Sequence, residues 1–186
     1  MGSPMVFNLV SAGYPVSVFS RTKSKALTVL EAGARWEDDI CQLSRSSDIV
    51  CTMVGYPEDL EKVVLSENGV IANMSPESIL IDFTTSSPEL AQRISGVASE
   101  RQVFSIDAPV SGGDVGAKSA TLAIMCGGDE KAFSMVEPFL QNLGDKIKYF
   151  GLSGAGQRVK MSNQILIAST MVGMVESMLY AERAGL

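Results

Sequence analysis

The sequence predicts an α/β fold in which a doubly wound, mostly parallel sheet is followed by one long helix. Up to Phe150, short β-rich segments alternate with helical segments, which implies right-handed crossovers between parallel strands. From Gly154 onward apolar residues recur with the helical period, and no Gly or Pro lies between Gly156 and Gly173. These observations indicate a Rossmann-like domain over residues 1–152 and a helical segment over residues 153–186.

The N-terminal segment predicts a helix with Ser3 as its N-cap, Pro4 at its first position and Gly13 just past its end. Alternating β-branched and aromatic residues predict the strands, and helical spacing with Pro or Gly at the boundaries predicts the remaining helices. In chain order these are strand 16–19, helix 24–31, helix 37–44, strand 48–54, helix 57–65, strand 79–83, helix 88–99, strand 103–107, strand 121–126, helix 129–141 and strand 146–150.

The start of a doubly wound domain normally holds an apolar strand that leads through a Gly-x-Gly turn into the first helix. Neither feature precedes the segment Met1–Met5. We therefore expect the first strand and the Gly-x-Gly to be missing, with Gly2 as the third glycine of the dinucleotide fingerprint.

The carboxyl ends of the strands are where such sheets bind ligands. One strand end carries Arg21 and Thr22, where a site for NAD would place an acidic residue. A guanidinium suits the 2′-phosphate of NADP, so NADP is the expected cofactor and NAD the alternative. The other interpretation of Arg21 is a solvated surface charge.

A glycine-rich loop follows the strand at residues 103–107. Ser111, Gly112 and Gly113 offer a hydroxyl and successive backbone N–H groups that can form a concavity for a carboxylate. An ordinary glycine turn into the next strand is the alternative.

The C-terminal helix carries an amine close to its start. Lys160 lies about one turn inside the helix, with Asn163 three residues on and Gln164 four residues on, near the same face. The chain has no histidine, so acid/base chemistry must use Lys, Tyr, Cys, Asp or Glu. Taken alone, a lysine at such a position is more often a solvated helix lysine, because charged side chains are mostly exposed.

Composition excludes several classes of protein. A net charge of −6 with dispersed Lys and Arg argues against nucleic-acid binding. No uninterrupted apolar run is long enough for a membrane helix, and the N-terminus lacks the features of a signal peptide. Three scattered cysteines fit reduced thiols better than a disulfide framework or a metal site. We expect no metal, and a location in the cytoplasm or an organelle matrix such as that of mitochondria rather than secretion.

Several ordered motifs resemble those of the β-hydroxyacid dehydrogenase family, in particular the 3-hydroxyisobutyrate dehydrogenase-like proteins. The strongest are DAPVSGGDVGAKSATLAIMCGGDE at 107–130 and GLSGAGQRVKMSNQ at 151–164. MGSPM at 1–5, SRT at 20–22 and IDFTTSSP at 81–88 lie at matching intervals, so the resemblance covers essentially the whole chain.

The resemblance implies an NAD(P)-dependent enzyme that interconverts a short 3-hydroxy acid and its semialdehyde. It implies that Lys160 is the catalytic lysine, that Asn163 orients the substrate, and that Ser111, Gly112 and Gly113 hold the substrate carboxylate. The cofactor residues that it implies are Arg21, Thr22, Val54, Gly55 and Thr85, and the fingerprint glycine Gly2 joins them.

Two departures from the family pattern qualify this assignment. Many relatives carry Asn at the fourth position after the lysine, where this chain has Gln164. The all-helical C-terminal domain, which usually builds the oligomer, is also absent, so we expect a fragment whose residues 153–186 only begin that domain, and a homo-oligomer at full length. The alternatives are a truncated, non-catalytic dinucleotide-binding or assembly module, a glyoxylate or succinic semialdehyde reductase, and a nucleosome-associated relative, which the acidic charge disfavours.

Overall fold

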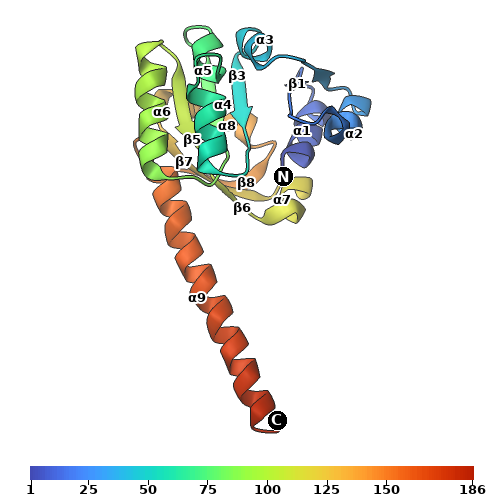
Figure 1. The fold of residues 1–186 in the computed structure, drawn as a ribbon, viewed down its shortest axis with the longest axis vertical. Helices are drawn as coiled ribbons and strands as arrows, with labels where there is room; N and C mark the ends of the chain where they lie inside the picture. Colours follow the sequence, from blue (N-terminus) through green and yellow to red (C-terminus); the bar gives the residue numbers. More distant parts are fainter.

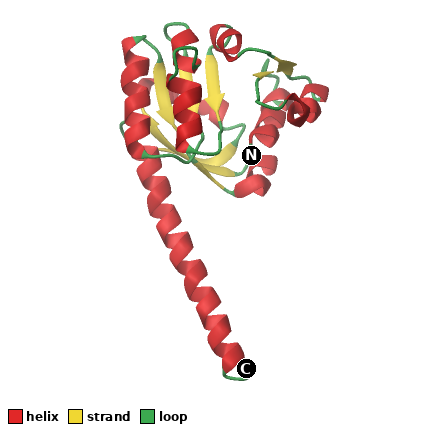
Figure 2. Ribbon diagram, in the orientation of Figure 1, coloured by secondary structure: helices red, strands yellow, loops and turns green.

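A computed structural model describes all residues from Met1 to Leu186, and Figure 1 shows a helix-covered sheet from which one helix projects. Figure 2 separates its helices from its strands. The helices are α1 (Gly2–Ser11), the 3₁₀ turn η1 (Lys23–Ala26), α2 (Leu27–Glu31), α3 (Ile40–Arg45), α4 (Pro57–Leu65), α5 (Val70–Asn73), α6 (Pro88–Glu100), α7 (Gly113–Ser119), α8 (Glu130–Leu140) and α9 (Ala155–Arg183). The strands are β1 (Ser17–Val18), β2 (Arg35–Trp36), β3 (Ile49–Thr52), β4 (Ile79–Asp82), β5 (Phe104–Asp107), β6 (Val110–Ser111), β7 (Leu122–Gly128) and β8 (Gly144–Tyr149).

The predicted mostly parallel, doubly wound sheet is confirmed. The main sheet has the order β3-β4-β5-β7-β6, with β8 paired to β7. The pairs β3–β4, β4–β5 and β7–β8 are parallel, whereas β5–β7 and β6–β7 are antiparallel. Strands β1 and β2 pair in parallel as a separate two-stranded sheet.

Two apolar cores lie on opposite faces of the main sheet. Leu80 belongs to the core beneath α4, α5 and α6, while its neighbour Ile81 belongs to the core that includes residues of α1, α7 and α8. Successive side chains of a strand point to opposite faces, so a strand covered on both sides is apolar throughout. In Figure 1, α4, α5 and α6 lie in front of the sheet and α8 behind it.

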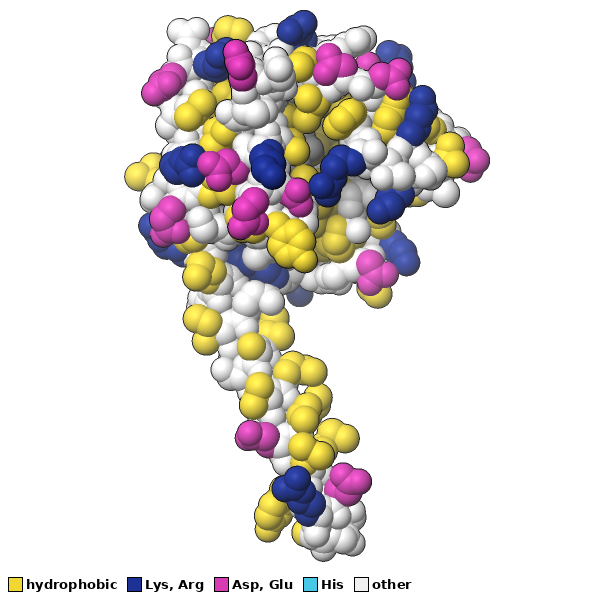
Figure 3. Space-filling view, viewed as in Figure 1, with side chains coloured by type: hydrophobic (Ala, Val, Ile, Leu, Met, Phe, Trp, Pro, Cys, Tyr) yellow, Lys and Arg dark blue, Asp and Glu magenta, His cyan; other side chains and the backbone are white.

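Helix α9 leaves this body after its first turns. Its buried residues are Gly156, Gln157 and Lys160, all near its N-terminus. Beyond them the helix is exposed and carries apolar side chains along its length, which Figure 3 shows in yellow. Its length, and the mean hydropathy of 1.3 of an 18-residue window within it, would allow it to cross a membrane, although the core helix of a soluble protein passes the same test. The sequence had shown no such span because polar residues interrupt every apolar run.

Some element predictions need correction. Helix 57–65 is confirmed, but Ser3 does not cap the first helix, which starts at Gly2 after Met1. Pro4 is accommodated because the first four N–H groups of a helix have no partner within it. The structure also contains β2, α5, β6 and α7, which were not predicted. Helix α7 includes two glycines and directly follows Gly112, so the loop does not turn straight into the next strand.

Candidate active site

The carboxyl ends of β3, β4 and β5 are aligned by register at Thr52, Asp82 and Asp107. The Thr52 hydroxyl donates to Asp82 Oδ1 at 2.7 Å, and the Thr84 N–H donates to the same oxygen at 3.0 Å. The Val54 N–H donates to Thr84 Oγ1 at 3.1 Å. These contacts fix the two loops that follow β3 and β4, in which the predicted cofactor residues Val54, Gly55 and Thr85 lie.

Three predicted site residues meet near the start of α9. The Lys160 amine and the Asn163 side-chain amide each donate to the Ser111 hydroxyl oxygen at 2.9 Å. Strand β6 delivers Ser111, and the i, i+3 spacing on α9 places Lys160 and Asn163 side by side. Lys160 is 8% exposed, and burial lowers the pKa of its amine. It is therefore not the solvated lysine of the alternative interpretation.

Gly112 and Gly113 shape the loop beside Ser111. Their φ angles are +131° and +62°, in the region that favours glycine. A Cβ on Gly112 would approach the Leu122 side chain at 3.2 Å, whereas one on Gly113 would meet no atom within 4 Å. The backbone of this loop is thus open on one side, next to the amine and the amide.

Asp107 and Gln157 were not predicted as site residues, yet both join α9 to the sheet. The Asp107 carboxylate accepts from the Gly154 N–H at 2.8 Å and from the Gln157 N–H at 2.9 Å. Gln157 also donates to the Thr84 carbonyl at 2.8 Å and accepts from the Ser86 N–H at 2.9 Å. The motif at 107–130 begins with Asp107, but the role of this residue depends on contacts about 50 residues away in the chain.

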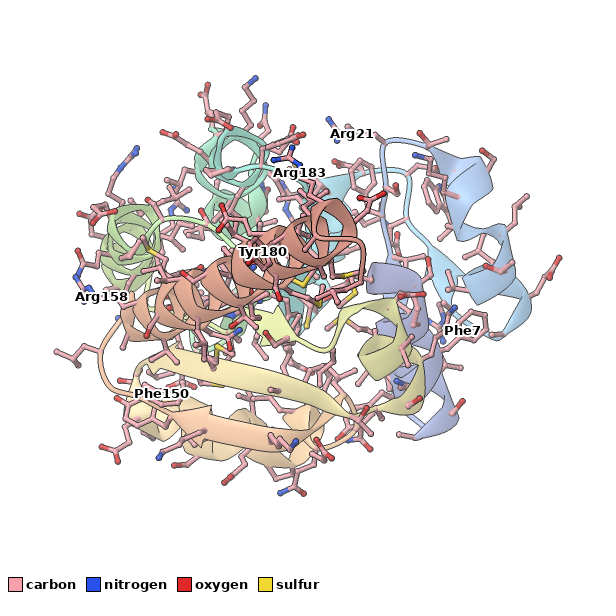
Figure 4. The ribbon with its side chains drawn as sticks, turned by 90° about the horizontal axis from the view of Figure 1, so that it is seen from below. Phe7, Arg21, Phe150, Arg158, Tyr180 and Arg183 are labelled. Atoms are coloured by element: carbon pink, nitrogen blue, oxygen red, sulfur yellow. The ribbon has the colours of Figure 1, made fainter.

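Arg21 lies at the edge of the molecule, with its side chain exposed (Figure 4). Its guanidinium is 3.2 Å from Asp59 Oδ1, and its side chain is 82% exposed. A Cβ on Gly55 would lie 3.6 Å from Asp59 Oδ2, so Arg21 and Gly55 flank one carboxylate. The Thr22 N–H donates to Ser20 Oγ at 3.5 Å, and Gly2 is the first residue of α1. The structure therefore separates the predicted residues into a partly buried cluster at Lys160 and an exposed cluster at Arg21.

The residues present fit a dinucleotide. Glycines and hydroxyl residues lie exposed at the ends of the strands, among them Gly55 and Thr85. The Ser86 hydroxyl, next to Thr85, is buried and has no hydrogen-bond partner. Buried hydroxyl groups rarely stay unpaired, so this atom indicates that a further polar group binds at the loop after β4.

The fold, together with the residues at the carboxyl ends of its strands, defines the class of protein: an α/β domain built to bind a dinucleotide. Residues 1–151 match the family model described as the NAD binding domain of 6-phosphogluconate dehydrogenase. Residues 154–186 match the model described as NAD-binding of NADP-dependent 3-hydroxyisobutyrate dehydrogenase.

Similar proteins agree with these matches. The chain is 47% identical over its whole length to an uncharacterized oxidoreductase of Bacillus subtilis. It is 46% identical to "Probable 3-hydroxyisobutyrate dehydrogenase-like 1, mitochondrial" of Arabidopsis thaliana. It spans 65% and 56% of the lengths of these two relatives. A solved structure of Mycobacterium tuberculosis 3-hydroxyisobutyrate dehydrogenase with L-serine is 33% identical, has a TM-score of 0.92, and is covered over 63% of its length. The chain belongs to the NAD(P)-binding β-hydroxyacid dehydrogenase family, as its motifs implied.

Proposed function

We propose that this chain is the NADP-binding part of a dehydrogenase that interconverts a short 3-hydroxy acid and its semialdehyde. The observation that carries the proposal is the convergence of Lys160 Nζ and Asn163 Nδ2 on Ser111 Oγ, each at 2.9 Å. An amine, an amide and a hydroxyl beside an open glycine loop can bind an oxygen-rich anion and move a proton to it. The lowered pKa of this partly buried amine favours proton transfer over the alternative of a non-catalytic binding module.

Lys160 is the proposed acid/base. Burial lowers the pKa of its amine, which brings proton transfer closer to the working pH. In the direction of reduction, Lys160 Nζ donates a proton to the carbonyl oxygen, and in the direction of oxidation it accepts the proton of the hydroxyl. When bound, the dinucleotide accepts or supplies the hydride.

Ser111, Gly112 and Gly113 are the proposed holders of the substrate carboxylate. Asn163 orients the substrate from the next position on α9. The mycobacterial 3-hydroxyisobutyrate dehydrogenase was solved with L-serine, which is itself a 3-hydroxy acid. That structure supports the proposal of a short 3-hydroxy acid as the substrate class for this chain, and the proposal does not specify the side chain of that acid.

The proposed cofactor is NADP, with NAD as the alternative. Arg21 and Thr22 would receive the 2′-phosphate and the ribose, and Val54, Gly55 and Thr85 would line the dinucleotide. Gly2 would lie at the start of the first helix, where a dinucleotide phosphate binds in this type of fold. The match of residues 154–186 to an NADP-dependent family model supports this choice.

The proposed domain boundary divides residues 1–152 from residues 153–186, and the two matched segments support it. The exposed apolar side chains of α9 are expected to be covered by further helical protein and by a second copy of the chain in the oligomer. The proposed location is the cytoplasm or an organelle matrix, and the mitochondrial relative supports the second.

A chimera provides the test: residues 1–186 replace the matching part of the Bacillus relative, and turnover is measured on a panel of short 3-hydroxy acids. Lys160→Ala should lower kcat by about 100-fold or more and leave dinucleotide affinity nearly unchanged. Lys118→Ala is the matched control, because Lys118 is an exposed lysine paired only with Asp114. Equal turnover in the two variants would refute the proposed role of Lys160.

A further inference from the structure

The first turn of α9 is anchored by a residue from a distant part of the chain. Its N-cap, Gly154, has no side chain, and no acidic residue lies in the turn itself. Asp107, at the end of β5, supplies the missing acceptors through both carboxylate oxygens. A carboxylate at this position also interacts favourably with the positive end of the helix dipole.

The start of α9 packs so closely against the sheet that only glycine fits at two contact positions, Gly127 and Gly156. A Cβ on Gly127 would lie 2.7 Å from the Gly156 nitrogen and 2.9 Å from Asp107 Oδ1. A Cβ on Gly156 would lie 2.6 Å from the Asp107 carbonyl oxygen. Real Cβ atoms essentially never show such distances, so the backbone of α9 touches β5 and β7 directly. The position of α9 along its own axis is therefore fixed by Asp107 and these two glycines.

Gln157 extends the same anchor to the loop after β4. It is fully buried, and its amide uses both ends on that loop, at the Thr84 carbonyl and the Ser86 N–H. Thr84 in turn accepts from the Val54 N–H, so the two loops with predicted cofactor residues are connected to α9. Lys160 lies three residues further along the helix, about one turn away.

We propose that Asp107 and Gln157 are positioning residues that hold the first turn of α9 so that Lys160 meets Ser111, an inference that rests on the role proposed for Lys160. Asp107 fixes the helix start against the sheet. Gln157 ties that start to the loop of Thr84–Ser86, so that the amine and the cofactor loop keep a constant relative position. The side chains of both residues bond to the backbone of α9 or of the loop after β4, and neither bonds to Lys160, Asn163 or Ser111.

Asp107→Asn is the decisive variant, and Asp82→Asn is its matched control. Asp82 pairs with Asp107 in the strand register, is equally buried, and bonds to Thr52 and Thr84 rather than to α9. The measurement is the pH dependence of acetylation by acetic anhydride, read at Lys160 by mass spectrometry in the 186-residue chain. Lys118, which is exposed, serves as an internal reference.

We expect the pKa of Lys160 to be lowered to the same extent in the wild-type chain and in Asp82→Asn, and to rise towards the usual value for lysine in Asp107→Asn. The direction of the shift separates two causes. Removing a nearby negative charge can only lower the pKa of a lysine, whereas release of the helix start hydrates the amine and raises it. An unchanged or lowered Lys160 pKa in folded Asp107→Asn overturns the inference.

Gln157→Met provides a second variant of similar size, in case Asp107→Asn fails to fold. Like Asp107→Asn, it should raise the pKa of Lys160. An unchanged pKa of Lys160 in Gln157→Met would contradict the proposed coupling to the cofactor loop. In the chimera, Asp107→Asn should lower kcat about tenfold or more with little change in the KM for dinucleotide, since small misplacement of a catalytic group is costly. It should have no further effect in a Lys160→Ala background.

These outcomes distinguish the two proposals. Normal turnover in Lys160→Ala would refute the acid/base role while the acetylation result still reports on the anchor. Loss of turnover in Lys160→Ala, combined with full turnover and an unshifted Lys160 in Asp107→Asn, would refute the anchor alone.

Discussion

The two ends of the candidate site are built differently. At the Lys160 end, a buried amine, an amide and a hydroxyl are held by hydrogen bonds from α9 and β6. At the Arg21 end, the arginine forms an ion pair with Asp59, and its side chain is 82% exposed. Exposed ion pairs contribute about 0–1 kcal/mol and are screened by salt, whereas buried polar clusters hold a fixed geometry. The Lys160 end is therefore preorganised, and the Arg21 end can rearrange when an anion binds.

Two buried carboxylates, at the ends of β4 and β5, should make the fold sensitive to pH. Burial raises the pKa of Asp82 and of Asp107 to about 6 from the usual value of 3.8. For an acid whose pKa is raised on folding, the folded state binds the proton more tightly, so stability is lost as pH rises from about 4 to about 6. A shift of about two units corresponds to at most about 3 kcal/mol for each group.

Urea unfolding at pH 4 and pH 7 checks this expectation. The free energy of unfolding should be lower at pH 7, and Asp107→Asn and Asp82→Asn should each remove part of the difference. The lowered pKa values of Asp39 and Asp114 act below this window, because they start from 3.8 and move down. Stability that rises between pH 4 and pH 6 would show that these two buried carboxylates are not desolvated.

Ser111 tests the centre of the buried end. Its hydroxyl accepts from both Lys160 and Asn163, and it is proposed to bind the substrate carboxylate in the ground state and the transition state alike. In the chimera, Ser111→Ala should therefore raise the KM for the hydroxy acid about tenfold, with a smaller effect on kcat. Steady-state kinetics separate the two, and a fall in kcat at constant KM would assign Ser111 to the proton transfer instead.

The same contrast explains what the sequence could predict. Lys160 and Asn163 share a helix face, and Pro57 marks the start of α4, so local spacing is enough for both. The joints of the site depend on distant contacts: Asp107 with Gln157, and Arg21 with Asp59, 38 residues apart. No local period encodes such pairs.

Helix α7 and the antiparallel pairing of β6 with β7 were missed for a related reason. Gly113 and Gly116 lower the helix propensity of a seven-residue segment, which resembles a turn, and tertiary packing overrides that preference. Strand β2 has only two residues, too few for an alternating pattern. The fold class was thus predictable from the long elements, and the short elements that position Ser111 were not.

Arg21→Ala tests the exposed end. If Arg21 receives the 2′-phosphate, the variant should weaken NADPH binding to the chimera about tenfold and change NADH binding little. Fluorescence titration of both cofactors measures the two affinities. Equal losses for NADPH and NADH would show that Arg21 does not read the phosphate, and NAD would become the preferred assignment.

Asp59→Asn should have the smallest effect and the opposite sign. Asp59 Oδ1 lies 3.2 Å from a guanidinium nitrogen of Arg21 and forms an ion pair with it. A 2′-phosphate must therefore compete with the Asp59 carboxylate for the N–H donors of Arg21. Replacing the carboxylate by an amide removes both the competitor and a negative charge that repels the phosphate. NADPH affinity should therefore rise a few-fold at low salt, about the worth of one exposed ion pair, and the gain should shrink as salt screens both charges. NADH affinity should stay constant, because NADH has no 2′-phosphate to compete.

Asp114→Asn is the matched control, since it removes an exposed carboxylate from another ion pair, the one with Lys118. A gain that is equal for NADPH and NADH, or equal in Asp59→Asn and Asp114→Asn, would reduce the effect to net charge and remove Asp59 from cofactor selection.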